Sequence, residues 1–193
     1  MLIAALGNPG QEYRLTRHNI AWQMIEYLSV FPDLKWDSKF RGDLATFKPE
    51  SGEGKKIYLL CPLTFMNLSG ESISAVMRFF KMDLEDLLVI HDDLELDFGI
   101  MGYKKGGGLA GHNGLRSVAS CLGTRDFNRL RMGISKPSHG DITPYVLGHF
   151  SLDEQAVLPV FLEETARILE TNLMEDMDTL VKKYKKHRII PDS

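Results

Sequence analysis

Short apolar runs alternate along this chain with segments of helical spacing, and this alternation limits the possible folds more than any other feature of the sequence. Runs that are apolar throughout, or that alternate apolar and polar residues, are typical of strands. The expected strands lie at 2–6, 42–48, 57–61, 87–90, 100–105 and 129–134. The strand at 100–105 is expected to be more exposed than the others, because lysines occupy its end.

Between these strands, apolar residues recur every three or four positions, as on the buried face of an amphipathic helix. One such face follows Asn19, a second follows the SGES stretch and a third follows Asn113. Asn67 or Ser69 is expected to cap the second helix, because both side chains can accept a hydrogen bond from a free backbone N–H.

Strands that alternate with helices predict an α/β fold, here a twisted mixed, largely parallel sheet with helices on both faces. A length of 193 residues fits a single domain over 1–193. Its C-terminal helical region is expected from about 151, where SLDE at 151–154 forms a capping-box pattern. That region is expected to be interrupted or kinked at Pro159.

The composition excludes several classes of protein. No run of about eighteen apolar residues is long enough to span a membrane, and the N-terminus does not have the pattern of a signal peptide. Cys61 and Cys121 lie in apolar contexts that indicate neither a disulfide framework nor a zinc site. The expected location is therefore the cytoplasm.

Charge is distributed unevenly along the chain, although the net charge is only −3. The stretch 101–139 carries seven basic residues against one acid, Asp126. Beside glycine-rich backbone, such a block indicates an anionic ligand, either phosphate or nucleic acid. The alternative is an ordinary solvated surface, and that interpretation suffices for the acidic stretch 150–180.

The unusual polar residues fall in loops that follow the expected strands, where ligands bind in open α/β sheets. In LGNPGQEYRLTRHN at 6–19, His18 stands at the start of a helix. The helix dipole there favours the neutral imidazole, which is the form that a general base requires. The alternative is that Asn19 caps the helix and His18 is a surface residue.

Two more loops allow more than one interpretation. In PLTFMNLSG at 62–70, Phe65 and Met66 either form an apolar floor of a site or tuck under the following helix. In VIHDDLEL at 89–96, the carboxylates at the strand end either bind a metal, orient a histidine or cap a turn. For a metal site the chain lacks a second histidine at ligand spacing, so no metal is predicted.

The glycine-rich loop YKKGGGLAGHNG at 103–114 matches several phosphate-binding patterns weakly. The preceding run is not the buried strand that a dinucleotide-binding unit needs, and His112 and Asn113 replace the Lys and Ser or Thr of a P-loop. GLAG at 108–111 also matches the short pattern of an RNA-binding KH module. Bare backbone N–H groups beside Lys104 and Lys105 nevertheless suit a phosphate.

Taken together, these loops resemble bacterial-type peptidyl-tRNA hydrolase. The stretches that carry the resemblance, in the family's order, are LGNPGQEY with TRHN, TFMNLSG, HDDLEL, GGGLAGHNGLRS, RLRMGIS with KP, and YVLGHF at 145–150. They extend from the first strand to about residue 150, and the C-terminal region is similar only in type and position.

The resemblance implies hydrolysis of the ester that joins a peptide, or an N-blocked aminoacyl group, to the terminal ribose of tRNA, which frees the tRNA for reuse. It implies that His18 is the general base and that Asp92 orients and polarises its imidazole. Asn8, Asn67 and Asn113 would discriminate the N-blocked end, bind the substrate and position the water or the oxyanion. The residues expected to contact tRNA are Tyr13, Phe65, Asn67, Asn113, Lys104, Lys105 and Arg131, with Arg129 or Lys136 as further candidates.

This chemistry requires no cofactor and no metal, because an ester needs only a base to deprotonate water and donors for the oxyanion. A serine or cysteine triad is disfavoured, since Ser69 and Cys61 lack a nucleophile-elbow context. The resemblance also implies a monomer with no obligate protein partner and no membrane association. Two other classes stay open: an RNA-binding module without catalysis, and a nucleotide-dependent enzyme that uses the glycine loop.

Three features depart from the family pattern or have no assigned role. Leu109 and Ala110 stand where glycine is common, which predicts a stiffer loop, and Ile20 replaces a frequent glycine. The basic stretch KKYKKHR at 182–188 is either a cluster of charges at a helix end or an extra contact to tRNA.

Overall fold

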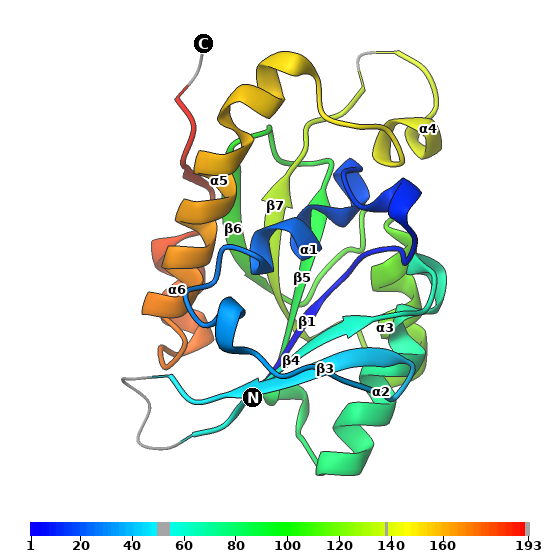
Figure 1. Ribbon diagram of the computed structural model, residues 1–193, viewed down its shortest axis with the longest axis vertical. Helices are drawn as coiled ribbons and strands as arrows, with labels where there is room; N and C mark the ends of the chain where they lie inside the picture. The colour runs from blue at the N-terminus through cyan, green and yellow to red at the C-terminus, as the bar shows by residue number, and fades with distance from the viewer. Residues whose placement is uncertain (50–54, 138, 192–193) are drawn as a thin grey trace.

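The computed structural model describes residues 1–49, 55–137 and 139–191. Within this part of the chain, eight strands form one sheet with helices packed on both faces (Figure 1). The strands are β1 (Leu2–Ala5), β2 (Asp37–Lys39), β3 (Gly42–Phe47), β4 (Ile57–Pro62), β5 (Leu87–Asp93), β6 (Ile100–Lys105), β7 (Asn128–Gly133) and β8 (His187–Arg188), in the order β2-β3-β4-β1-β5-β7-β6-β8. The predicted mixed α/β fold is confirmed.

Parallel pairing is confined to the centre of the sheet, where β4, β1, β5 and β7 lie side by side. These four strands are almost wholly buried, because helices cover both faces of the sheet. The strand β1, most of β4 and the first half of β5 are apolar, whereas polar residues occur at the end of β5 and along β7. Antiparallel strands complete both edges. Because β1, β4, β5 and β7 point the same way, the loops that follow them emerge at one edge of the sheet.

The helices divide into two layers. They are α1 (Ile20–Ile25), α2 (Ser69–Phe80), α3 (Asn113–Leu122), α4 (Ile142–Val146), α5 (Leu152–Thr171) and α6 (Met177–Lys183), and short 3₁₀ turns occur at Gln11–Tyr13, Arg17–Asn19, Phe31–Asp33, Met66–Leu68 and Leu84–Asp86. Helices α1 and α5 pack on one face of the sheet, and α2 and α3 pack on the other. Each layer has its own apolar core, and the sheet lies between them.

Three local predictions differ from the structure. Neither Asn67 nor Ser69 caps α2, whose N-cap is Leu68, and Asn19 makes no capping bond to α1. The strand β6 is buried over Ile100–Tyr103, because α6 and β8 cover it. Its antiparallel pairing with β7 still excludes a dinucleotide-binding unit, which requires parallel strands.

The C-terminal region contains one continuous long helix rather than a broken one. The predicted capping box of Ser151 and Glu154 begins α5, and Pro159 lies inside its twenty residues without ending it. The basic stretch 182–188 passes from the end of α6 into β8, which pairs with β6. No described helix is long and apolar enough to cross a membrane.

Candidate active site

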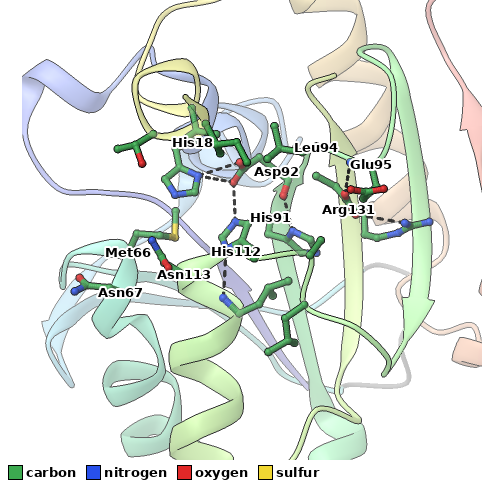
Figure 2. A pocket seen from close by; sticks show the side chains of 18 of the residues that line it. His18, Met66, Asn67, His91, Asp92, Leu94, Glu95, His112, Asn113 and Arg131 are labelled. Carbon is green, nitrogen blue, oxygen red and sulfur yellow. Dashed lines mark hydrogen bonds and ion pairs between the residues drawn. The ribbon is translucent and has the colours of Figure 1, made fainter. Parts of the chain in front are cut away.

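A cleft with a volume of about 610 Å³ opens at the carboxyl edge of the parallel strands. Its walls come from the loops after β1, β4 and β5, from the glycine loop that leads into α3, and from α4. The cleft thus gathers residues that lie more than a hundred positions apart in the sequence (Figure 2). Nearly all of the predicted site residues line it: Asn8, Tyr13, His18, Phe65, Asn67, Asp92, Lys104, Asn113 and Arg131.

The imidazole of His18 is held by the carboxylate of Asp92. Nδ1 of His18 lies 2.9 Å from both carboxylate oxygens, and both side chains are buried. Asp92 stands near the end of β5, whereas His18 lies in the 3₁₀ turn that precedes α1. Because Nδ1–H donates to Asp92, the lone pair of the neutral ring is on Nε2.

A second histidine, His112, donates to the same carboxylate. Its Nε2 lies 2.9 Å from Oδ1 of Asp92, and its Nδ1 accepts a hydrogen bond from the backbone N–H of Leu115. His112 is also the N-cap of α3, so the helix start fixes which nitrogen faces Asp92. No local pattern in the sequence singles out His112, because only the folded chain brings it within 4.9 Å, ring centre to ring centre, of His18.

These contacts shift the acid–base properties of both partners. Burial alone would raise the pKa of Asp92, but the imidazoles of His18 and His112 lower it well below its usual range. Burial would lower the pKa of His18, yet the charge of Asp92 and its hydrogen bond raise it. The carboxylate therefore outweighs the effect of burial, and it stabilises the protonated form of His18.

His18, Asp92 and His112 lie close enough together to be considered as metal ligands. The second histidine that the sequence lacked at ligand spacing is thus supplied by the fold. However, Nδ1 of His112 accepts from a backbone N–H, so its Nε2 carries the proton of the neutral ring and cannot ligate. The oxygen Oδ1 between the two rings is already an acceptor for both. This donor set suits a carboxylate with two N–H donors rather than a metal.

His91 lies fully buried behind the site. Its Nδ1 donates to the backbone carbonyl of Asp92 at 2.6 Å, and its ring centre is 5.1 Å from that of His112. Burial and the neighbouring His112 lower the pKa of His91 well below its usual value. His91 is consequently neutral and helps to fix the backbone that carries Asp92.

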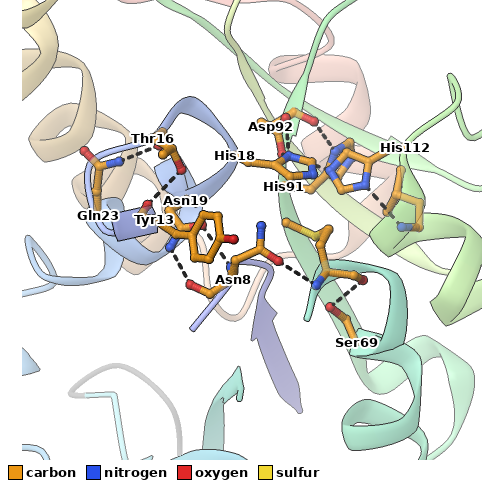
Figure 3. A network of polar contacts seen from close by, with 12 residues as sticks. Asn8, Tyr13, Thr16, His18, Asn19, Gln23, Ser69, His91, Asp92 and His112 are labelled. Carbon is orange, nitrogen blue, oxygen red and sulfur yellow. Dashed lines mark hydrogen bonds and ion pairs between the residues drawn. The ribbon is translucent and has the colours of Figure 1, made fainter. Parts of the chain in front are cut away.

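Asn8 is oriented by a network that joins the loop after β1 to the loop after β4 (Figure 3). Its Oδ1 accepts from the backbone N–H of Met66 at 2.7 Å, and its own backbone N–H and C=O both bind the side chain of Asn19 at 2.9 Å. Asn19 therefore connects the two ends of the loop between β1 and α1 instead of capping α1. With Oδ1 engaged, the amide NH₂ of Asn8 is the group presented to the cleft.

The other two asparagines are exposed at the cleft wall. Asn67 lies in the turn before α2, and Asn113 begins α3 directly after His112. Gly114 allows this close approach, since a Cβ there would lie 2.5 Å from Sδ of Met66. Figure 2 shows Asn67 and Asn113 near Met66, on the side of the cleft opposite Arg131.

Phe65 and Met66 were expected to behave alike, either as an apolar floor of the site or as residues packed under the helix, but they differ in the structure. Phe65 is 56% exposed and faces Tyr13, with ring centres 6.5 Å apart and planes nearly perpendicular. Met66 is buried under the start of α2. The exposed aromatic pair at the cleft is suited to stacking against a base or ribose.

The predicted phosphate-binding residues do not form one patch. Lys104 and Arg131 line the cleft, whereas Lys105 points to the other face of β6 and pairs with Asp178 at 3.7 Å. Arg131 also binds Asp93 and the carbonyl of Lys185. Burial, followed by the charges of Arg131 and Arg129, lowers the pKa of Lys104.

The two further candidates for phosphate binding have partners in the protein. Arg129 is 1% exposed, and its guanidinium donates to the carbonyls of Gly107, Gly108 and Arg125. Burial lowers its pKa to about 10. Arg129 lines the cleft, and these bonds make it a support of the glycine loop. Lys136 pairs with Glu95 at 2.6 Å on the surface.

The three residues that depart from the family pattern, Leu109, Ala110 and Ile20, differ in burial and in distance from the cleft. Ala110 adopts a left-handed backbone with φ of 47°, a conformation that costs a residue with Cβ about 1–2 kcal/mol. Leu109 lines the cleft and packs against the core under α2 and α3. Ile20 is fully buried in the core on the α1 face and does not line the cleft.

A buried imidazole oriented by a carboxylate, beside open amide groups at the carboxyl edge of a mixed sheet, is the arrangement of a hydrolytic α/β enzyme. The family profile described as "Peptidyl-tRNA hydrolase" matches residues 2–191. The chain belongs to the peptidyl-tRNA hydrolase family.

Relatives and solved structures agree with this assignment. The chain is 43% identical to a peptidyl-tRNA hydrolase of Geotalea daltonii over 98% of both chains. It is also 43% identical to one of Treponema pallidum, over 98% of this chain and 96% of the relative. A crystal structure of peptidyl-tRNA hydrolase from Acinetobacter baumannii matches with a TM-score of 0.77 and 33% identity, over 93% of each chain.

Proposed function

We propose that this protein hydrolyses the ester between a peptide, or an N-blocked aminoacyl group, and the terminal ribose of tRNA, with His18 as the base that activates water. The observation that carries this proposal is the hydrogen bond from Nδ1 of His18 to Asp92, which leaves Nε2 free to accept a proton. Membership of the family supplies the reaction class and the substrate class.

In the proposed mechanism, Nε2 of His18 removes a proton from water as the water oxygen attacks the acyl carbon. The imidazolium that forms is stabilised by Asp92, whose charge raises the pKa of His18. His112 donates to the other side of the same carboxylate and keeps its plane fixed. The proton then passes from His18 to the ribose oxygen as the C–O bond breaks, so free tRNA and free peptide result.

Amide groups would stabilise the oxyanion of the tetrahedral intermediate. The NH₂ of Asn8 is the strongest candidate, because its oxygen is already engaged by Met66 and cannot turn toward the substrate. Asn67 and Asn113 are exposed in the same cleft and can bind the acyl chain or the terminal nucleotide. Neutral donors suit this role, since a fixed positive charge would also attract phosphates.

Contacts to the RNA are assigned to residues at the mouth of the cleft. Tyr13 and Phe65 offer exposed rings for the terminal nucleotide, and Lys104 with Arg131 offers positive charge for a phosphate. Lys105 would act on a separate surface, because it points away from the cleft. Contacts of this kind ignore base sequence, which suits a substrate with many different tRNAs.

The decisive experiment measures peptide release from N-acetyl-aminoacyl-tRNA in the presence of EDTA. Wild-type protein should release the acyl group, and His18→Ala should lower kcat by about 10²- to 10⁴-fold, the usual contribution of a positioned base. His139→Ala, at an exposed histidine outside the cleft lining, is the matched control. Equal kcat in wild type and His18→Ala would refute the assignment of the base.

The same assay separates the proposed enzyme from the two alternatives. Salt-sensitive RNA binding without any release of peptide would favour a binding module. A requirement for ATP or NAD would favour a nucleotide-dependent enzyme. We further propose that the protein acts as a monomer in the cytoplasm, where peptidyl-tRNA arises; sedimentation of the purified protein tests the oligomeric state.

A further inference from the structure

Arg17, the residue directly before His18, connects the turn that carries the proposed base to the opposite wall of the cleft. It is 8% exposed, and its Nη2 donates to Oε2 of Glu154 at 2.7 Å. Its Nη1 donates to the backbone carbonyl of His149. A buried arginine with two partners on one distant segment is a structural clamp rather than a surface charge.

Aromatic rings of the same segment enclose the guanidinium. Cζ of Arg17 lies 4.3 Å from the ring centre of Tyr145 and 5.2 Å from that of Phe150. Phe150 is itself buried against Phe98 in the core. These contacts hold the guanidinium through its faces as well as through its edge.

The main chain makes the same connection. The N–H of Arg17 donates to the carbonyl of Gly148 at 3.0 Å, and Thr16 forms an antiparallel bridge with His149. Glu154 completes the link, because its Oε2 also accepts from the N–H of Ser151 in the capping box of α5. The residues 16–17, 145, 148–150 and 154 therefore form one unit, which we name the Arg17 clamp.

The segment held by the Arg17 clamp is part of the cleft. Ile142, Thr143, Val146 and Leu147, from α4 and its end, line the cavity that His18 also lines. Ile142 is 56% exposed there. In Figure 1, α4 lies beside the blue chain between β1 and α1, far in sequence but adjacent in space.

The orientation of the guanidinium also has a cost. Among the described residues, Nε of Arg17 is buried and has no hydrogen-bond partner. A buried unsatisfied donor is unfavourable. The hydrogen bonds made by Nη1 and Nη2 offset this cost. Such an arrangement is typical of a residue that fixes the relative position of two segments.

We propose that Arg17 is a positioning residue that sets the distance between the base, His18, and the apolar cleft wall at 142–147. Substrate bound against this wall is then placed relative to Nε2 of His18 by a single rigid unit. The inference rests on the proposed function, because it assigns the wall a role in binding the substrate of that reaction. Arg17 itself is not among the residues that line the cleft.

The test compares Arg17→Gln and Arg17→Lys with wild type in the peptide-release assay and by hydrogen exchange. Arg17→Gln should raise KM by about tenfold, the lower end of what one apolar contact contributes to substrate discrimination. The value of kcat should fall by up to about 10²-fold, because the substrate is no longer held at its distance from Nε2 of His18. The pH midpoint of kcat should stay unchanged, because the pair of His18 and Asp92 is untouched. Arg17→Lys should be intermediate, since one ammonium cannot reach both acceptors.

Hydrogen exchange gives a readout that does not depend on catalysis. In Arg17→Gln, the amides of 142–148 should exchange faster while those of β1 and β5 keep the wild-type rate. Glu154→Gln, which removes one acceptor charge from the clamp, should change KM and exchange in the same direction but less. Arg167→Gln, which breaks an exposed pair with Glu164 on the same helix, is the matched control and should change neither.

Each outcome decides between the ideas. Unchanged KM and unchanged exchange at 142–148 in Arg17→Gln would overturn the proposal, and so would faster exchange throughout the sheet, which would indicate only a structural role. A fall in kcat with a shifted pH midpoint would also overturn it, because Arg17 would then act on His18 directly. If wild type releases no peptide at all, the proposed function fails instead, and the assigned role of the wall fails with it.

Discussion

Nε2 of His112 lies 2.9 Å from Oδ1 of Asp92, as close as Nδ1 of His18 lies to the same oxygen. The carboxylate thus accepts from two imidazoles that come from different loops. A charge with donors on both sides has little freedom to rotate, and in a buried site each such bond contributes more than it would at the surface. The geometry of the proposed base therefore depends on three residues rather than two.

Replacing Asp92 by Asn should change the pH dependence of the reaction. Asp92 raises the pKa of His18, so its loss should move the midpoint of the acidic limb of kcat/KM, where the base becomes protonated, to lower pH. The value of kcat should fall by about 10²- to 10⁴-fold, because the imidazolium loses its counter-charge. Measurement of kcat/KM from about pH 5 to about pH 9 tests both effects. Asp97→Asn, at an acid outside the cleft lining, serves as control, and an unmoved midpoint would contradict the assignment of Asp92.

Replacing His112 by Leu should loosen Asp92 and leave one donor fewer on its charge. We expect kcat to fall by about tenfold, equivalent to about 1.4 kcal/mol of barrier. The free energy of unfolding should fall by about 1.5–3 kcal/mol, the contribution of a hydrogen bond to a charged group. His112→Gln, whose amide can donate near the position of Nε2, should recover most of the activity. Enzyme kinetics and urea denaturation check the pair, and equal losses in both variants would contradict the role of the N–H donor.

His91 should make the protein sensitive to mild acid. The unfolded chain takes up a proton at His91 as the pH falls below about 6.5, whereas the folded chain does not, because burial and His112 lower its pKa. The unfolded state then binds more protons. The free energy of unfolding therefore decreases as the pH is lowered, by up to about 1.4 kcal/mol per pH unit. His91→Asn keeps a donor near the position of Nδ1 and removes the titration. Its urea midpoint should change less than that of wild type between about pH 7 and about pH 5, and parallel curves would exclude this role of His91.

Lys104 and Lys105 should differ in their effect on tRNA binding, although they are adjacent. Lys104→Ala removes a charge from the cleft and should lower the slope of log Kd against log salt by about one. Lys105→Ala should leave binding at the cleft unchanged, because Lys105 lies on the other face of β6 near Asp178. Titration of tRNA at several salt concentrations compares the two. Equal slopes for both variants would contradict the prediction that Lys104 binds tRNA in the cleft while Lys105, on the other face of β6, does not.

Ala110→Gly should stabilise the protein. Ala110 has a φ of 47°, which glycine adopts without the Cβ clash that alanine suffers. We expect a gain of about 0.5–1 kcal/mol in the free energy of unfolding, since strain relief exceeds the entropy that glycine adds to the unfolded chain. Chemical denaturation measures it, and Ala119→Gly in the middle of α3, where φ is helical, should destabilise instead.

Much of the fold follows from local patterns in the sequence. The central strands were predictable because each contains a short apolar run or, in β7, an alternation of apolar and polar residues. The start of α5 was predictable because its capping box is contiguous. The edge strands β2 and β8 are short and charged, so nothing in their own residues indicates pairing. They are strands because β3 and β6 offer them free backbone groups.

The site was predictable where motifs are contiguous and unpredictable where the fold joins distant residues. His18 and Asp92 stood in recognisable loops, but nothing local indicated that His112 would reach Asp92. Arg129 alternates with core residues in β7 and looked like a surface cation, yet the glycine loop folds over it. Asn19 has the form of a helix cap, and its amide instead binds the backbone of Asn8 at the other end of the same loop.

The hold of Arg129 on the carbonyls of Gly107 and Gly108 has a consequence for affinity. Glycine-rich loops usually lose conformational entropy when a ligand orders them, and this loss weakens binding. Here the ordering has already occurred during folding. An incoming acceptor end would therefore meet a surface that is set in advance, and its residence time would depend on the contacts it makes rather than on the rearrangement it imposes.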